Sequence, residues 1–163
     1  MFLAFAYPFM KRITYWPQLF LGLTFNWGII MAWTSVMGDI SLSILILYFS
    51  AIFWTLGYDT IYGAQDMSDD EIIGLKSTSI KFKKNMNLFI SISFLIFIIL
   101  IIYLFNNFYG KNIFTIFAIM FVLTLIYQLF ELMKQNSKNY LRLFKFNNYT
   151  GILLFISILS INF

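Results

Sequence analysis

Five of the seven acidic residues of this chain lie between positions 59 and 71, at the junction of two long apolar stretches. They are Asp59, Asp66, Asp69, Asp70 and Glu71. Carboxylates that gather where a hydrophobic span meets water repel one another unless a cation binds among them. Segment 58–78 is therefore the first place in the chain where we expect chemistry.

Oxygen ligands of this kind suit a hard divalent cation, and Mg2+ uses one or two carboxylates together with substrate phosphates and water. If the preceding helix continues, Asp59, Tyr62, Asp66 and Asp70 lie within roughly 80° around its axis. One face then presents three carboxylates and a phenol. Gly63 would let a neighbouring backbone or a ligand come close to that face.

The alternative interpretation is a solvated loop whose acidic residues are balanced by lysines that follow in the sequence. These lysines are Lys76, Lys81, Lys83 and Lys84. Because like charges on one face repel in the absence of a counterion, the spacing favours a metal and phosphate site. The chain has no cysteine and no histidine, which excludes thiolate and imidazole metal sites, thiol nucleophiles and Ser-His-Asp triads.

The elements around this segment must be membrane helices, because 61% of the residues are hydrophobic and only 11% are charged. Uncharged runs cover residues 13–38, 40–58, 85–110, 112–130 and 146–163. Each run is long enough for a helix to cross a hydrocarbon core of roughly 30 Å. We predict an all-α, polytopic transmembrane bundle with five full spans, forming one unit over residues 1–163. Residues 2–7 resemble the end of a further helix, so we expect the chain to begin within a span.

Basic residues predict the orientation of these spans, since Lys and Arg near span ends stay on the cytoplasmic side. Ten of the eleven lie in segments 8–16, 59–84 and 131–145, and only Lys111 lies on the opposite side. We therefore expect an integral protein of a bacterial inner membrane, with the Asp-rich segment facing the cytoplasm. The net charge of +4 follows from this topology and requires no nucleic-acid partner.

Several segments, taken together, resemble a known family. They are Tyr7-Pro8-Phe9-Met10-Lys11-Arg12 with Pro17-Gln18, Gly22 to Gly28 with Met31-Ala32, Tyr58-Asp59-Thr60 with Tyr62 and Asp66, Asp69-Asp70, and Gly74 with Lys76-Ser77-Thr78. In this order and spacing they resemble the 4-hydroxybenzoate polyprenyltransferases of ubiquinone synthesis. Asn147-Asn148-Tyr149 and Gly151 resemble the last span of that family, so the likeness covers essentially the whole chain.

The resemblance implies a bundle of nine spans, of which this chain would be the C-terminal part. It also implies two Asp-rich motifs facing one cavity, and this chain carries only the second. The first begins with Asn-Asp in the family, and no Asn-Asp dipeptide occurs in these 163 residues. We therefore expect an incomplete enzyme that is inactive alone, whose missing half could be encoded separately.

The resemblance further implies a Mg2+-dependent transfer of a polyprenyl group from a polyprenyl diphosphate to the ring of 4-hydroxybenzoate. Asp59 and Asp66 would be the catalytic acids, and both would bind the metal together with Asp70. Lys11, Arg12, Tyr62 and Lys76 would contact or orient the substrates. Met67 and Ser68 stand where the family usually has a basic and an acidic residue.

Two alternatives stay open at this stage. One is a prenyltransferase that acts on a different aromatic acceptor. The other is a non-catalytic membrane subunit whose acidic loop binds a cation, although the five uncharged runs contain no ionisable carboxylate or ammonium group along an ion path.

Overall fold

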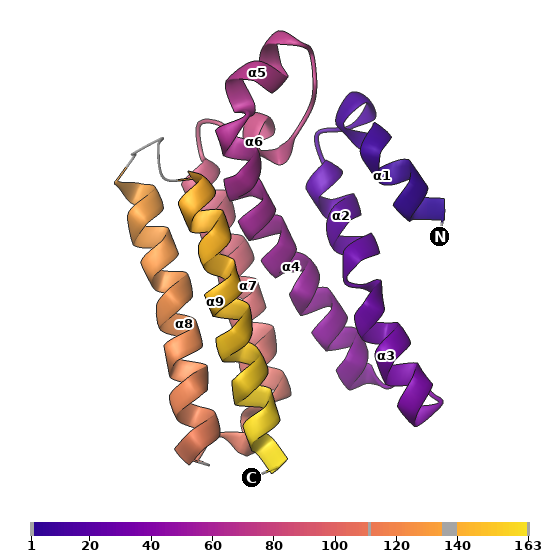
Figure 1. Ribbon diagram of the computed structural model, residues 1–163, viewed down its shortest axis with the longest axis vertical. Coiled ribbons are helices and arrows are strands. Elements are labelled where there is room, and N and C mark those ends of the chain that lie inside the picture. The colour runs from indigo at the N-terminus through magenta and orange to yellow at the C-terminus, as the bar shows by residue number, and fades with distance from the viewer. Residues whose placement is uncertain (1, 111, 135–139, 163) are drawn as a thin grey trace. The chain divides into compact units, whose positions relative to one another are not determined.

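The computed structural model describes residues 2–110, 112–134 and 140–162. Every regular element in these ranges is helical, which confirms the all-α prediction (Figure 1). Lys111 and Lys138, which enter the predicted charge asymmetry, lie outside the described residues. In chain order the elements are α1 (Phe2–Ile13), α2 (Pro17–Phe25), α3 (Trp27–Met37), α4 (Leu42–Gln65), α5 (Met67–Ile72), α6 (Thr78–Lys81), α7 (Met86–Leu104), η1 (Asn106–Phe108), α8 (Asn112–Met133), α9 (Tyr140–Leu159) and η3 (Ser160–Asn162).

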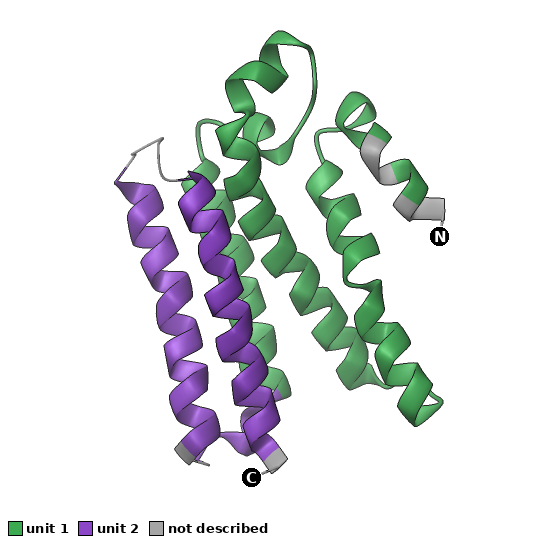
Figure 2. Ribbon diagram, viewed as in Figure 1, with its two compact units in different colours: residues 1–104 green, residues 105–163 purple. Residues whose placement is uncertain are grey.

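The chain divides into two compact units, residues 1–104 and residues 105–163 (Figure 2). Unit 1 contains α1 to α7, and unit 2 contains η1, α8, α9 and η3. All of the acidic segment lies in unit 1. We describe each unit by itself.

Helix α4 is the central element of unit 1, and it packs closely on α7. Gly57 lies directly against the ring of Phe94, which is fully buried. One turn earlier, the rings of Trp54 and Phe97 stack with centroids 5.3 Å apart. A glycine at the contact lets two apolar helices approach closely, which is how membrane helices gain van der Waals energy.

The uncharged run 13–38 does not form one straight helix, because the chain breaks at Asn26 between α2 and α3. The Asn26 amide nitrogen donates to Gly22 O at 2.9 Å and to Thr55 Oγ1 of α4 at 2.8 Å. A side chain that bonds into the backbone ladder is a known cause of helix kinks. The same amide thus ends α2 and ties it to α4.

Two helix boundaries differ from the sequence prediction. Helix α1 continues beyond Pro8 to Ile13, so that Lys11 and Arg12 lie on its last turn, where positive charge is favoured by the helix dipole. Helix α4 ends at Gln65, Asp66 caps it, and α5 starts at Met67. The continuous helix expected through Asp70 is therefore wrong.

Unit 2 is built on α8 and α9, which run in opposite directions (Figure 1). Gln128 of α8 is fully buried; its amide nitrogen donates to Thr150 Oγ1, and its oxygen accepts from Asn147 Nδ2, both at 3.2 Å. Hydrogen bonds of this kind hold helices together where no water can replace the partner.

Within the described residues, four segments are long and apolar enough to cross a membrane. They are Pro17–Met37, Leu42–Gln65, Met86–Leu104 and Ile113–Met133, and they match the first four predicted spans. The fifth predicted run falls in α9, whose first half carries Arg142, Lys145, Asn147 and Asn148. These polar residues explain why the count is one lower than predicted.

The contact between Gly57 and Phe94 predicts the effect of adding a single methyl group. Gly57→Ala places Cβ into the Phe94 ring and should lower the free energy of unfolding by about 1–3 kcal/mol, as overpacking does. Gly28→Ala is the matched control, because nothing lies within 4 Å of its added Cβ, and it should be neutral or stabilising by up to about 1 kcal/mol. Thermal unfolding in detergent, followed by circular dichroism, measures both; equal effects would contradict the packing argument.

Candidate active site

All residues that the sequence assigns to the site lie in unit 1, on α1, α4, α5 and the segment before α6. Lys11 and Arg12 occupy the last turn of α1, and Asp59 and Tyr62 lie in the last two turns of α4. Asp66 caps α4, Asp70 belongs to α5, and Lys76 precedes α6. Figure 1 shows α5, α6 and the end of α1 beside the same end of α4.

Lys11 is the cation that links these parts. Its Nζ lies 3.0 Å from Asp70 Oδ2, and its positive charge also acts on the carboxylate of Asp59. The Asp70 side chain is only 9% exposed, whereas that of Lys11 is 37% exposed. The structure therefore pairs the Lys11 ammonium group with Asp70 and leaves its outer side accessible to a further anion.

Asp59 and Asp66 lie on nearly the same side of α4, because seven residues at 100° each return almost to the starting direction. The rise between them is about 10.5 Å at 1.5 Å per residue. Both are half-buried, and exposed Tyr62 lies between them along the helix. Asp59 and Asp66 can thus flank a ligand laid along the end of α4.

The predicted metal ligands are not gathered around one point. Among the described residues, no group of three Asp, Glu, His or Cys side chains could hold a metal ion. Asp70 departs from the predicted arrangement because α4 ends before it and Lys11 takes its carboxylate. Asp59 and Asp66 remain as the candidate carboxylates, and Mg2+ sites can use as few as one or two protein carboxylates together with phosphate oxygens and water.

Lys76 joins the segment before α6 to the end of α1. Its backbone N–H donates to Lys11 O at 2.7 Å, and its Nζ donates to Ile13 O at 3.2 Å and lies 5.6 Å from the Tyr15 ring centroid. Lys76 is thus a positioning residue for Lys11 in this conformation. Arg12 is exposed at the same helix end.

A buried hydrogen-bond network that sequence reasoning missed fixes the Lys-Ser-Thr segment against α4. The Thr78 N–H donates to Gln18 Oε1 at 3.0 Å, and the Thr78 and Thr60 hydroxyls lie 2.7 Å apart. Ser79 Oγ donates to Thr60 O at 2.8 Å. The signal in the sequence was Gln18, a polar residue inside an otherwise apolar run, which the structure buries to 3% exposure.

Gly63 makes this network sterically feasible. A Cβ at this position would lie 2.7 Å from Ser79 Oγ and 3.2 Å from Gln18 Nε2. The close approach expected at Gly63 is present, although side chains rather than a backbone make it.

The lysines of the solvated-loop interpretation have individual partners. Lys83 Nζ lies 2.6 Å from Glu71 Oε2, and Lys81 Nζ lies 4.3 Å from the centroid of the Trp16 ring. Glu71 is therefore balanced as that interpretation expects. Neither lysine is paired with Asp59 or Asp66 in the described ion pairs.

Comparisons with known proteins agree with the fold described above. A sequence model described as the UbiA prenyltransferase family matches residues 1–158. The "4-hydroxybenzoate polyprenyltransferase, mitochondrial" of Bos taurus is 56% identical over 87 residues, which are 53% of this chain and 24% of that protein. The human protein of the same name is 56% identical over 84 residues, which are 51% of this chain and 23% of the human protein. The matched part thus spans about a quarter of these relatives' length.

A solved structure is similar over nearly the whole chain. The apo structure of a UbiA homolog from Aeropyrum pernix K1 superposes with a TM-score of 0.76 and covers 97% of this chain and 60% of that one. At 22% sequence identity, this likeness shows the fold.

Because Asp70 is buried, its ion pair with Lys11 should contribute a larger coupling free energy to stability than an exposed ion pair does. A double-mutant cycle of Lys11→Met and Asp70→Asn should give a coupling of about 1 kcal/mol in the free energy of unfolding. The matched cycle of Lys83→Met and Glu71→Gln should give about 0.5 kcal/mol or less, because those side chains are 52% and 36% exposed. Chemical or thermal unfolding of the wild type, the four single mutants and the two double mutants in detergent measures both couplings, and equal values would contradict the predicted difference.

Proposed function

Because the chain belongs to the UbiA prenyltransferase family, we propose that the polar end of unit 1 forms the second Asp-rich side of a Mg2+-dependent prenyl transfer site. The donor would be a polyprenyl diphosphate and the acceptor 4-hydroxybenzoate, as in ubiquinone synthesis. The observation that carries the proposal is the ion pair between Lys11 and Asp70, formed at the same end of unit 1 that carries Asp59 and Asp66. An array of alternating charges at the end of membrane helices suits a diphosphate head with an apolar tail.

The anionic side of the site would be Asp59 and Asp66. When bound, Mg2+ neutralises a diphosphate and makes it a better leaving group. The role of this chain would be to hold the two carboxylates along one side of α4 and to keep basic side chains near them. Gln18, Thr60 and Thr78 contribute indirectly, because their hydrogen bonds fix the segment that carries Lys76 against α4.

The cationic side would be Lys11, with Arg12 beside it. The Lys11–Asp70 pair is partly exposed, so its net stabilisation is modest, on the order of 1 kcal/mol. A diphosphate carries more negative charge than one carboxylate, and it can compete for Lys11 at this small cost. Tyr62, exposed between Asp59 and Asp66, would orient the bound group.

The location that we propose is an integral membrane position, with the polar end of unit 1 on the side where basic residues collect. The sequence predicts a bacterial inner membrane, whereas the bovine and human relatives are named as mitochondrial proteins. The membrane-embedded position is common to both.

Binding of a prenyl diphosphate should depend on Mg2+ and on Asp59 and Asp66. For the purified chain, we expect Asp59→Asn or Asp66→Asn to reduce Mg2+-dependent retention of a radiolabelled prenyl diphosphate by about tenfold or more, since a charge-assisted contact contributes about 1.5–3 kcal/mol. Asp39→Asn is the control, because Asp39 is exposed between α3 and α4. Retention that is unchanged by chelation, or lost equally in all three variants, would exclude this site.

The family resemblance implies that catalysis requires two Asp-rich segments. These 163 residues contain one of them. We expect the purified chain with Mg2+, prenyl diphosphate and 4-hydroxybenzoate to show no turnover above background. Co-expression with a polypeptide that carries an Asn-Asp motif of the family should restore it, and Asp59→Asn in the co-expressed pair should abolish it again. Turnover by the chain alone would overturn the two-segment requirement, and replacing 4-hydroxybenzoate by other phenols tests the acceptor.

A further inference from the structure

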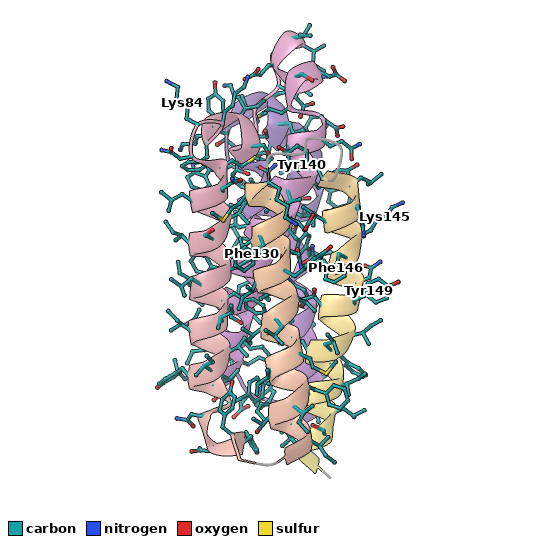
Figure 3. All side chains as sticks on the ribbon, turned by 90° about the vertical axis from the view of Figure 1, so that its left-hand side faces the viewer. Lys84, Phe130, Tyr140, Lys145, Phe146 and Tyr149 are labelled. Atoms are coloured by element: carbon teal, nitrogen blue, oxygen red, sulfur yellow. The ribbon has the colours of Figure 1, made fainter. Side chains whose placement is uncertain are left out.

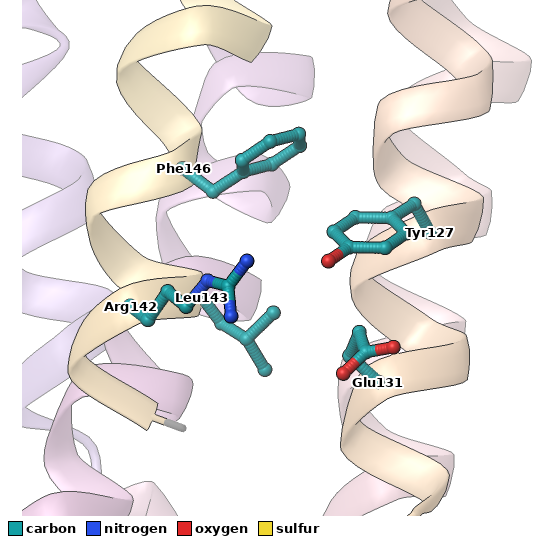
Figure 4. Close-up of a pocket in the computed structure, with 5 residues that line it drawn as sticks. All are labelled: Tyr127, Glu131, Arg142, Leu143 and Phe146. Carbon is teal, nitrogen blue, oxygen red and sulfur yellow. The ribbon is translucent and has the colours of Figure 1, made fainter. Parts of the chain in front are cut away.

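A shallow pocket lies between α8 and α9 in unit 2, and the proposed transfer site does not use it. Tyr127 and Glu131 of α8 line one side, and Arg142, Leu143 and Phe146 of α9 line the other (Figure 4). The lining residues come from this unit alone, so the pocket is a property of the α8 and α9 pair.

The floor of the pocket is apolar, and its rim carries the Arg142 guanidinium and the Glu131 carboxylate. The rings of Tyr127 and Phe146 lie 5.2 Å apart at an angle of 51°, and Leu143 is buried beneath the rim. The Arg142 guanidinium extends across the opening toward Tyr127 and Glu131 (Figure 4). The guanidinium therefore faces an aromatic surface, with the Glu131 carboxylate on the same rim.

The charge balance leaves Arg142 available for an anion. Glu131 already forms an ion pair with Lys134, one turn further along α8. Arg142 takes part in none of the ion pairs found among the described residues. Because Lys134 pairs with Glu131, Arg142 is the charged lining residue that these ion pairs leave for an external anion.

The depth of the pocket along α8 corresponds to lipid headgroups. The 22 residues of α8 measure about 33 Å at 1.5 Å per residue, slightly more than a hydrocarbon core of roughly 30 Å. Tyr127 and Glu131 lie in its last two turns, so their side chains reach the zone where the core ends. Tyrosine and arginine are typical of that zone.

We propose that this pocket binds the phosphate group of an anionic membrane lipid. Arg142 donates two N–H groups to the phosphate, the Tyr127 hydroxyl is positioned to add a third donor, and Phe146 and Leu143 contact the first carbons of the lipid. Basic pockets between transmembrane helices near a membrane surface bind such headgroups, and arginine matches the geometry of phosphate oxygens.

The choice of a lipid over a free anion rests on the apolar floor and the membrane depth of the pocket. Inorganic phosphate would use only the Arg142 rim and would leave the Phe146 and Leu143 surface uncovered. A lipid covers both surfaces with one molecule.

Native mass spectrometry of the purified chain with defined lipids tests the proposal. We expect the wild type to retain phosphatidylglycerol over phosphatidylcholine and Arg142→Gln to lower that retention about tenfold, the loss of one charge-assisted contact. Lys145→Gln is the matched control: it removes a positive charge from the same helix, but Lys145 projects from the side of α9 away from α8 (Figure 3). This control should retain phosphatidylglycerol nearly as the wild type does.

Three outcomes would overturn the proposal. Equal losses in Arg142→Gln and Lys145→Gln would mean general attraction to surface charge. No loss in Arg142→Gln would exclude the pocket, provided that circular dichroism shows unchanged helix content, and displacement of the lipid by millimolar inorganic phosphate would assign the pocket to a free anion. Retained binding in Arg142→Lys with reduced preference for phosphatidylglycerol would support the role of the guanidinium.

Discussion

The structure depends on one constraint: polar groups placed among apolar helices must find partners, because an unpaired buried group costs about 1–3 kcal/mol. In unit 1 this constraint joins Thr78 to Gln18 and Thr60, and Asn26 to Thr55. In unit 2 it joins Gln128 to Asn147 and Thr150. These hydrogen bonds fix the position of each helix along its neighbour, which apolar contacts alone would not do. The candidate functional residues lie on helices held in this way.

The charged residues of unit 1 follow a different rule, since Lys11 is attracted to a buried carboxylate and stays partly open to water. Lys11 pairs with Asp70, while Lys76 donates to the backbone oxygens of Lys11 and Ile13. Partial exposure keeps the Lys11–Asp70 pair weak. The site is thus rigid in its buried hydrogen bonds and exchangeable in its ion pairs, a combination that lets a charged substrate enter without disturbing the fold.

The spans and the site were predictable to the extent that they depend on local sequence. Uncharged runs located four membrane segments, and the cluster from Asp59 to Glu71 located the polar end of α4. The break at Asp66, the continuation of α1 past Pro8 and the kink at Asn26 were not predicted. The kink depends on a partner distant in sequence, because the Asn26 amide bonds to Thr55. Gln18 gives the clearest case: it is 60 residues from Thr78, and no local pattern assigns it a role.

The lack of a three-carboxylate cluster among the described residues bears on how metal and substrate would bind. A site with three or more acidic ligands can hold a cation without substrate, whereas Asp59 and Asp66 supply at most two protein ligands. Mg2+ demands near-octahedral coordination and gives up its waters reluctantly, so its remaining ligands here would have to be water and diphosphate oxygens. Metal and diphosphate would then each raise the affinity for the other, because thermodynamic coupling between two ligands is reciprocal. In such a site the acidic segment stays partly neutralised by Lys11 until both arrive.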